Sequence, residues 1–223
     1  KNPAQDTCVS IKSIDINLYS GQTSENNGFH LSSNAHGAPY INVSYFMPFA
    51  YRVFKSIDPE GAEVWSSLLN MTYKDLFTSL NLSLNDLEGN QISANGYLFP
   101  NWYQLDKLTG FPTDVSTQTE NTNVRGFEFG YDAFRTIWFL AYDYFLYYDL
   151  RSLQLLEKVH PFFKSELDNN GMIYPVYQIN GTPAVTNIDY TPFGFYAVYL
   201  NLFKILNDSI SEDMILQMYP AHR

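Results

Sequence analysis

The feature that most constrains this chain is a run of largely aromatic and aliphatic residues, GYDAFRTIWFLAYDYFLYYD, at positions 130–149. Its pattern predicts a helix over residues 131–149 with apolar side chains on nearly every face. A helix of that kind is expected to be buried on all sides. Its first turn nevertheless carries Asp132 and Arg135, so two charged groups stand at the entrance to an otherwise apolar element.

Asp132 and Arg135 are three positions apart, so their side chains can touch on one helix face. One interpretation is an ion pair at the helix start, because an acidic side chain there complements the helix dipole. The other is a carboxylate that faces a cavity and is held by Arg135, as general-base activation of water requires. The helical period continues the same face through Thr136, Phe139 and Asp143. The spacing alone leaves both interpretations open.

The rest of the chain is predicted to be helices joined by loops. Hydrophobic spacing and turn residues place helical segments at 11–20, 45–57, 60–81, 151–168, 191–206 and 211–218. Ser44 is expected to cap the second of these helices. The pair Asn180-Gly181 predicts a small β-hairpin within residues 171–188. Residues 82–129 are predicted to be irregular, and a stretch of that length without strong periodicity is usually functional or disordered.

The chain has a formal net charge of −10 and includes 18 Tyr and 3 Trp. The negative charge argues against nucleic acid as a partner and against anionic membrane surfaces, whereas the aromatic side chains suit a sugar. Arg135 and Asp143 argue against a membrane-spanning role for the helix at 131–149. His30 and His36 share a loop without nearby carboxylates, so we expect no metal site, and no motif indicates a cofactor.

A buried helix at 131–149 followed by a half-exposed helix at 151–168 fits either a double ring of helices or a large helical bundle. Three segments, in chain order, resemble glycoside hydrolase family 8. They are INVSYFMPFAYRVF at 41–54, GYLFPNW at 96–102 and FEFGYDAFRTIWFLAYDYF at 127–145. The family contains endo-β-1,4-glucanases, xylanases, chitosanases and lichenases, and the resemblance covers residues 30–206.

The resemblance implies an all-α (α/α)6 barrel, with six inner and six outer helices and a substrate cleft across one end. Enzymes of this family invert the anomeric configuration by using one acid and one base. By the match, Asp132 is the expected general base, Arg135 orients it, and Tyr45 lies near the reacting sugar and water. The helices expected here amount to about half a barrel, together with the small β-hairpin.

Several other side chains are candidates for contacts with substrate. The aromatic residues that could stack on sugar rings are Trp102, Tyr103, Tyr131 and Tyr190. Glu128 could be a second carboxylate in the cleft, but we expect an exposed loop acid instead. The sequence departs from the family at Val43, where a Pro is usual, and at Asn101, where an Asp is usual.

The family's glutamic acid motif and its Ala-Thr/Ser-Asp-Ala/Gly-Asp helix do not occur in the sequence. We therefore expect residues 1–223 to be a single domain that forms the C-terminal portion of the barrel, with the general acid on an N-terminal portion that this sequence lacks. The expected function is hydrolysis of a β-1,4-linked polysaccharide (glucan, xylan or chitosan) by a secreted or periplasmic bacterial enzyme. A non-catalytic glycan-binding protein on the same scaffold and a plain structural bundle are the alternatives.

Overall fold

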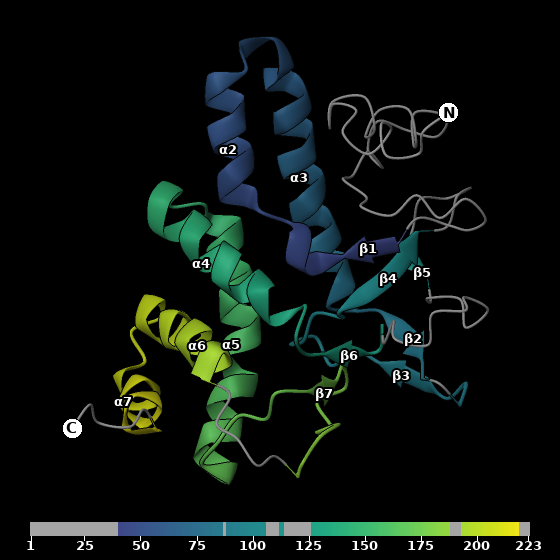
Figure 1. The fold of residues 1–223 in the computed structure, drawn as a ribbon, viewed down its shortest axis with the longest axis vertical. Helices are drawn as coiled ribbons and strands as arrows, with labels where there is room; N and C mark the ends of the chain where they lie inside the picture. The colour runs from purple at the N-terminus through teal and green to yellow at the C-terminus, as the bar shows by residue number, and fades with distance from the viewer. Residues whose placement is uncertain (1–39, 87, 106–111, 114–125, 188–192, 219–223) are drawn as a thin grey trace, which may run out of the picture.

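The fold comes from a computed structural model that describes residues 40–86, 88–105, 112–113, 126–187 and 193–218. The helical segment predicted at 11–20 and the predicted site residue Tyr190 lie outside these ranges. Figure 1 shows helices gathered on one side of the described part and short strands on the other.

The helices form three consecutive antiparallel pairs (Figure 1). The pairs are α2 (Pro48–Ile57) with α3 (Ala62–Ser79), α4 (Phe134–Tyr147) with α5 (Leu150–Asn170), and α6 (Phe193–Ile205) with α7 (Ser209–Met218). Helix α4 contacts both α2 and α6, whereas α5 contacts both α3 and α7. The first members of the pairs therefore make one layer and the second members another. This is the arrangement of half an (α/α)6 barrel, so the predicted fold class is confirmed.

The largest differences from the predicted helix boundaries are at the starts of α4 and α2. The helix predicted at 131–149 begins only at Phe134, because residues 131–133 form a turn. It ends at Tyr147, because the next residue, Tyr148, has a left-handed backbone with a φ of +55°. Ser44 does not cap α2. It lies inside a short 3-10 helix, η3 (Val43–Tyr45), and α2 starts later, at Pro48, which suits a first helical position because it has no N–H to satisfy.

Short strands occupy part of the region that the sequence predicted to be irregular. They are β2 (Ser83–Asn85), β3 (Gln91–Ser93), β4 (Trp102–Leu105), β5 (Pro112–Thr113) and β6 (Glu128–Phe129), with β1 (Tyr40–Asn42) and β7 (Tyr177–Gln178) on either side. All pairs are antiparallel, in the orders β1-β4-β5, β2-β3 and β6-β7. The predicted turn is present at Gly181, with a φ of +92°, but β7 pairs mainly with β6. The predicted hairpin is present in short form: Gln178 N donates to the Thr182 carbonyl at 2.8 Å and Ala184 N to the Val176 carbonyl at 3.0 Å, around the bridge between Tyr177 and Pro183.

Helix α4 is buried on one side only, so the prediction that it is buried on all sides is wrong for the described residues. Its covered side carries Thr136, Ile137, Phe139, Leu140, Ala141 and Asp143. The other side exposes large rings at i, i+4 and i+7, namely Trp138, Tyr142 and Phe145, and the last of these is 72% exposed. We call these three residues the aromatic stripe. Periodicity could not reveal it, because both sides of the helix are apolar.

A buried carboxylate ties α4 to three other helices. Asp143 has no exposed side-chain surface, and its Oδ1 accepts a hydrogen bond from Arg52 Nε of α2 at 2.8 Å. Its Oδ2 accepts from the Tyr73 hydroxyl of α3 at 2.5 Å and from Ser152 Oγ of α5 at 3.3 Å. Burial, together with the hydrogen bond and charge of Asp143, raises the pKa of Tyr73 well above its usual value, so the hydroxyl stays a neutral donor.

A second carboxylate extends this network toward the surface. Asp149 caps α5 by accepting from Arg151 N at 2.8 Å, and Arg52 also pairs with it. Arg151 holds the same carboxylate from its Nε and Nη2 atoms, at 3.0 and 2.7 Å. Burial alone would raise the pKa of Asp149, but the hydrogen bonds and charge of Arg151, with the charge of Arg52, lower it to about 2. The start of α5 is therefore anchored to α2.

We expect Asp143→Ala to lower the free energy of unfolding by about 3–5 kcal/mol, because it leaves the Arg52 guanidinium without its buried partner. The matched control is Asp168→Ala, which removes an exposed carboxylate 3.2 Å from Lys164 Nζ and should cost at most about 0.5 kcal/mol. Urea denaturation followed by circular dichroism measures both. Equal, small losses in the two variants would show that the buried network contributes little.

A buried acid in α3 gives a pH-dependent prediction. Burial raises the pKa of Asp75 to about 7, above its value of about 3.9 in an unfolded chain. The folded state then binds the proton more tightly, so stability is lost as pH rises through this window. Asp75→Asn should raise the free energy of unfolding at pH 8 by up to about 4 kcal/mol, and by much less near pH 4. Urea denaturation at both pH values tests this, and a gain independent of pH would contradict it.

Candidate active site

The carboxylate of Asp132 is held from two sides at the entrance to α4. It lies in the turn before the helix, and its Oδ2 accepts a hydrogen bond from the Trp102 indole Nε1 at 3.0 Å. The Arg135 guanidinium, in the first turn of α4, donates to Oδ1 and forms the ion pair that the spacing predicted. Each carboxylate oxygen thus has one donor that fixes its orientation. The Asp132 side chain is still 30% exposed, so its remaining lone pairs are accessible.

Asp132 stands at the wall of a pocket of about 360 Å³. The pocket is lined by Asn101, Trp102, Glu128, Gly130, Tyr131, Asp132, Val176 and Val185. These residues come from the chain around β4 and β6, from the turn before α4 and from the segment around β7, which Figure 1 shows close together. Pockets for small ligands combine mostly apolar walls with a few converging polar groups. This one joins two aromatic rings, two valines, an amide and two carboxylates.

Tyr45 is brought to the same place, although it does not line the pocket. It is the last residue of η3, and its ring meets the edge of the Trp102 ring with centroids 6.5 Å apart. The Tyr51 hydroxyl donates to the Tyr45 carbonyl at 3.4 Å. The structure therefore gathers the three residues predicted to be catalytic, Asp132, Arg135 and Tyr45, around Trp102.

The residues predicted to stack on sugars fall into different environments. Trp102 and Tyr131 line the pocket, and Tyr131 is 56% exposed, with its ring set edge-on against Phe195 at 5.4 Å. Tyr103 is fully buried, because side chains alternate along β4 and its neighbour Trp102 takes the pocket side. A ring with no exposed face cannot stack on a sugar, so that prediction is corrected.

Glu128 is the pocket residue that the sequence analysis assigned wrongly. We expected an exposed loop acid, but the side chain is only 7% exposed and lies in β6, which pairs with β7. The only sequence signal was its position between Phe127 and Phe129, both also buried. Asn101 is likewise a pocket residue, directly before Trp102, and its backbone N–H donates to the Glu128 carbonyl at 2.7 Å.

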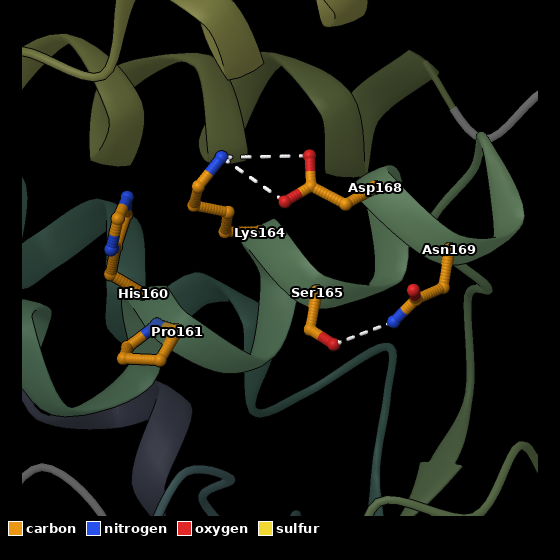
Figure 2. Close-up of a pocket in the computed structure, with 6 residues that line it drawn as sticks. All are labelled: His160, Pro161, Lys164, Ser165, Asp168 and Asn169. Atoms are coloured by element: carbon orange, nitrogen blue, oxygen red, sulfur yellow. Dashed lines mark hydrogen bonds and ion pairs between the residues drawn. The ribbon is translucent and has the colours of Figure 1, made fainter.

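A second hollow, of about 510 Å³, lies along α5 and differs in chemistry (Figure 2). It is lined by His160, Pro161, Lys164, Ser165, Asp168 and Asn169. Within it Lys164 pairs with Asp168, and Asn169 Nδ2 donates to Ser165 Oγ at 2.9 Å (Figure 2). Its lining includes no Trp, Tyr or Phe side chain and none of the predicted site residues, so it is not a candidate for sugar stacking.

Within the described ranges, no group of three or more His, Cys, Asp or Glu side chains is placed to hold a metal ion. Among the helices of the same ranges, none combines the length and the apolar character that a membrane span requires.

Comparison with known proteins relates the fold to glycoside hydrolases. No family model matches the sequence, and no curated protein matches it. Among solved structures, a GH8 xylanase of Teredinibacter turnerae, a catalytic mutant in complex with xylohexaose, has a TM-score of 0.62 at 15% identity, over 86% of this chain and 43% of that one. Rex8A of Paenibacillus barcinonensis, complexed with xylose, has a TM-score of 0.59 at 16% identity, over 99% and 54%.

An endo-1,4-D-glucanase of Vibrio fischeri ES114 is also similar, with a TM-score of 0.56 at 18% identity, over 80% of this chain and 44% of that one. At these identities the similarity establishes the fold, which is that of part of a GH8-type (α/α)6 barrel. The chain spans between 37% and 54% of the lengths of the structures that it resembles.

The difference between Tyr103 and Tyr131 can be tested directly. Tyr103→Ala should lower the free energy of unfolding by about 3–5 kcal/mol, because it leaves a cavity in the core. Tyr131→Ala should cost about 1 kcal/mol or less, since the ring is more than half exposed and meets Phe195 edge-on. Thermal and urea denaturation of both variants measure this. A large loss for Tyr131 would mean that its ring supports the fold and does not form an open pocket wall.

Proposed function

We propose that this chain forms part of an inverting glycoside hydrolase that cleaves β-1,4-linked polysaccharide, with Asp132 as the general base. The observation that carries the proposal is the Asp132 carboxylate, which Trp102 and Arg135 hold at the wall of a pocket with aromatic sides. The fold supports it, because the similar structures include xylanases and an endoglucanase. Secretion or a periplasmic location is part of the proposal, because such polymers are too large to enter a cell.

In the proposed reaction, a water molecule attacks the anomeric carbon while the Asp132 carboxylate accepts its proton. The bond to the leaving sugar breaks, and a carboxylic acid on the opposite side of the sugar protonates the departing oxygen. In inverting enzymes the two carboxyl groups are about 6.5–9.5 Å apart, which leaves room for the water. Arg135 and the Trp102 indole fix the base, while Trp102 and Tyr131 offer ring faces to the sugar.

We propose that the general acid belongs to an N-terminal portion of the barrel, which would pack against this chain. The aromatic stripe of α4 supports this, because soluble proteins rarely leave a large contiguous apolar patch uncovered. The length of the similar structures, about twice that of this chain, also supports it. The chain by itself is then expected to show little or no turnover.

Asp132→Asn should reduce the hydrolysis rate by about three orders of magnitude or more, because the amide cannot take the proton from water. The measurement is release of reducing ends from xylan, carboxymethylcellulose and chitosan, by this chain together with the remainder of the barrel. Asp168→Asn, on the exposed side of α5, is the matched control and should leave the rate unchanged. NMR of the first product formed should show an inverted anomer.

Three outcomes would change this proposal. Full activity of the Asp132→Asn variant would remove Asp132 as the base. Full activity from a verified 223-residue chain would place the acid within it. Oligosaccharide binding without turnover, even with the rest of the barrel present, would favour a glycan-binding protein on the same scaffold. If the chain is instead a plain structural bundle, oligosaccharide should neither bind to it nor change its melting temperature.

A further inference from the structure

Asn101 makes three hydrogen bonds to the segment that carries Asp132. Its side-chain Oδ1 accepts from the backbone N–H of Gly130 at 3.0 Å and of Ala133 at 2.9 Å. Its own backbone N–H donates to the Glu128 carbonyl at 2.7 Å. The side chain is only 9% exposed, so these bonds form where water competes little. Asn101, about thirty positions earlier in the sequence, is thus hydrogen-bonded to both ends of the segment 128–133.

Asn101 accepts from one of the backbone N–H groups at the start of α4, that of Ala133. The first backbone N–H groups of a helix have no partner within the helix, and a side chain at the N-cap usually accepts from them. In α4 the N-cap residue is Ala133, whose side chain cannot do so. The N–H groups of the next three residues donate to backbone carbonyls of the turn itself, whereas the N–H of Ala133 donates to Asn101. With its bond to Gly130, Asn101 thus fixes the peptide groups on either side of residues 130–132.

The residue that follows Asn101 completes the arrangement. Trp102 donates its indole N–H to the Asp132 carboxylate, so adjacent residues hold the backbone of the turn and the side chain that projects from it. Strand pairing fixes Trp102 in turn, because it lies opposite Asn42 in the β1–β4 ladder. The position of Asp132 is therefore set by strand β4 as well as by α4.

We propose that Asn101 is a positioning residue for Asp132, and that it acts by fixing the turn at residues 130–133 in register with Trp102. The inference rests on the proposed function for the chemistry of Asp132, but the positioning itself can be measured without turnover. The required property of residue 101 is a side-chain acceptor of the length of Asn. Asp retains that acceptor and Ala lacks it.

The three Trp residues provide the measurement. In a ¹H–¹⁵N spectrum of the chain, the Trp102 indole N–H reports its bond to Asp132, and Asp132→Ala gives the position of that signal when the bond is lost. Trp65 is a matched internal control, because its Nε1 donates to Asp58 at 2.8 Å at the far end of α2. Asn101→Ala should move the Trp102 signal toward its position in Asp132→Ala and leave the Trp65 signal in place. In the Asn101→Asp variant, the Trp102 signal should stay at its position in the unmodified chain.

Ligand binding to this chain together with the remainder of the barrel gives the second readout, with xylohexaose as the probe in calorimetric titration. Asn101→Ala should weaken binding about tenfold, or about 1.4 kcal/mol, whereas Asn101→Asp should bind within about twofold of the unmodified chain. A loss of binding with no shift of the Trp102 signal would overturn the positioning role, as would a folded Asn101→Ala protein with both readouts unchanged.

The test does not depend on whether Asn101→Ala folds. In the unmodified chain, the amides of Gly130 and Ala133 should exchange slowly with deuterium because both donate to Asn101, and rapid exchange at both would also refute the inference. The proposed function can fail separately. If the Trp102 signal moves as expected but xylohexaose, cellohexaose and chitosan hexamers all fail to bind even with the rest of the barrel present, the positioning role stands and the glycosidase proposal does not.

Discussion

The arrangement of the helices depends on one buried carboxylate. Asp143 has no access to solvent, and it meets an arginine from α2, a tyrosine from α3 and a serine from α5. Removing a carboxylate from water is costly, and the cost is offset only when its oxygens are well supplied with donors. Because those donors come from three helices, the charge is satisfied only when all three are in place. The same interaction holds the helices α2 and α4 together and so fixes the layer from which the turn at residues 131–133 projects.

Much of this fold could be predicted from the sequence. Apolar spacing located the helices described within a few residues, and the three short motifs indicated a barrel of the right class. The pairing of Asp132 with Arg135 also followed from spacing, because side chains three positions apart meet on a helix. Trp102 and Tyr131, named from the sequence as candidates for stacking on sugars, both line the pocket, and their contact with a sugar stays a prediction. These features depend on local periodicity or on short motifs, which a single sequence contains.

The features that could not be predicted depend on contacts between distant segments. Glu128 sits in a two-residue strand that exists only because β7, some fifty positions later, pairs with it. Tyr103 and Trp102 are adjacent and chemically alike, and only the pairing of β4 decides which of them turns inward. The aromatic stripe of α4 could not be predicted for another reason. An apolar helix face has the same sequence pattern whether or not a neighbour covers it.

Helix α4 connects the buried Asp143 network to the proposed active site at Asp132. Asp143 fixes it near one end, and Arg135 lies eight residues earlier, or about 12 Å along the axis. A rotation of roughly 2.5° about the anchor would displace Arg135 by about 0.5 Å, which is near the tolerance of a catalytic arrangement. The orientation of α4 about Asp143 in the core therefore sets the position of Arg135 at the pocket. A small change in packing around Arg52 would therefore displace Arg135 relative to the pocket, although Arg52 itself does not line the pocket.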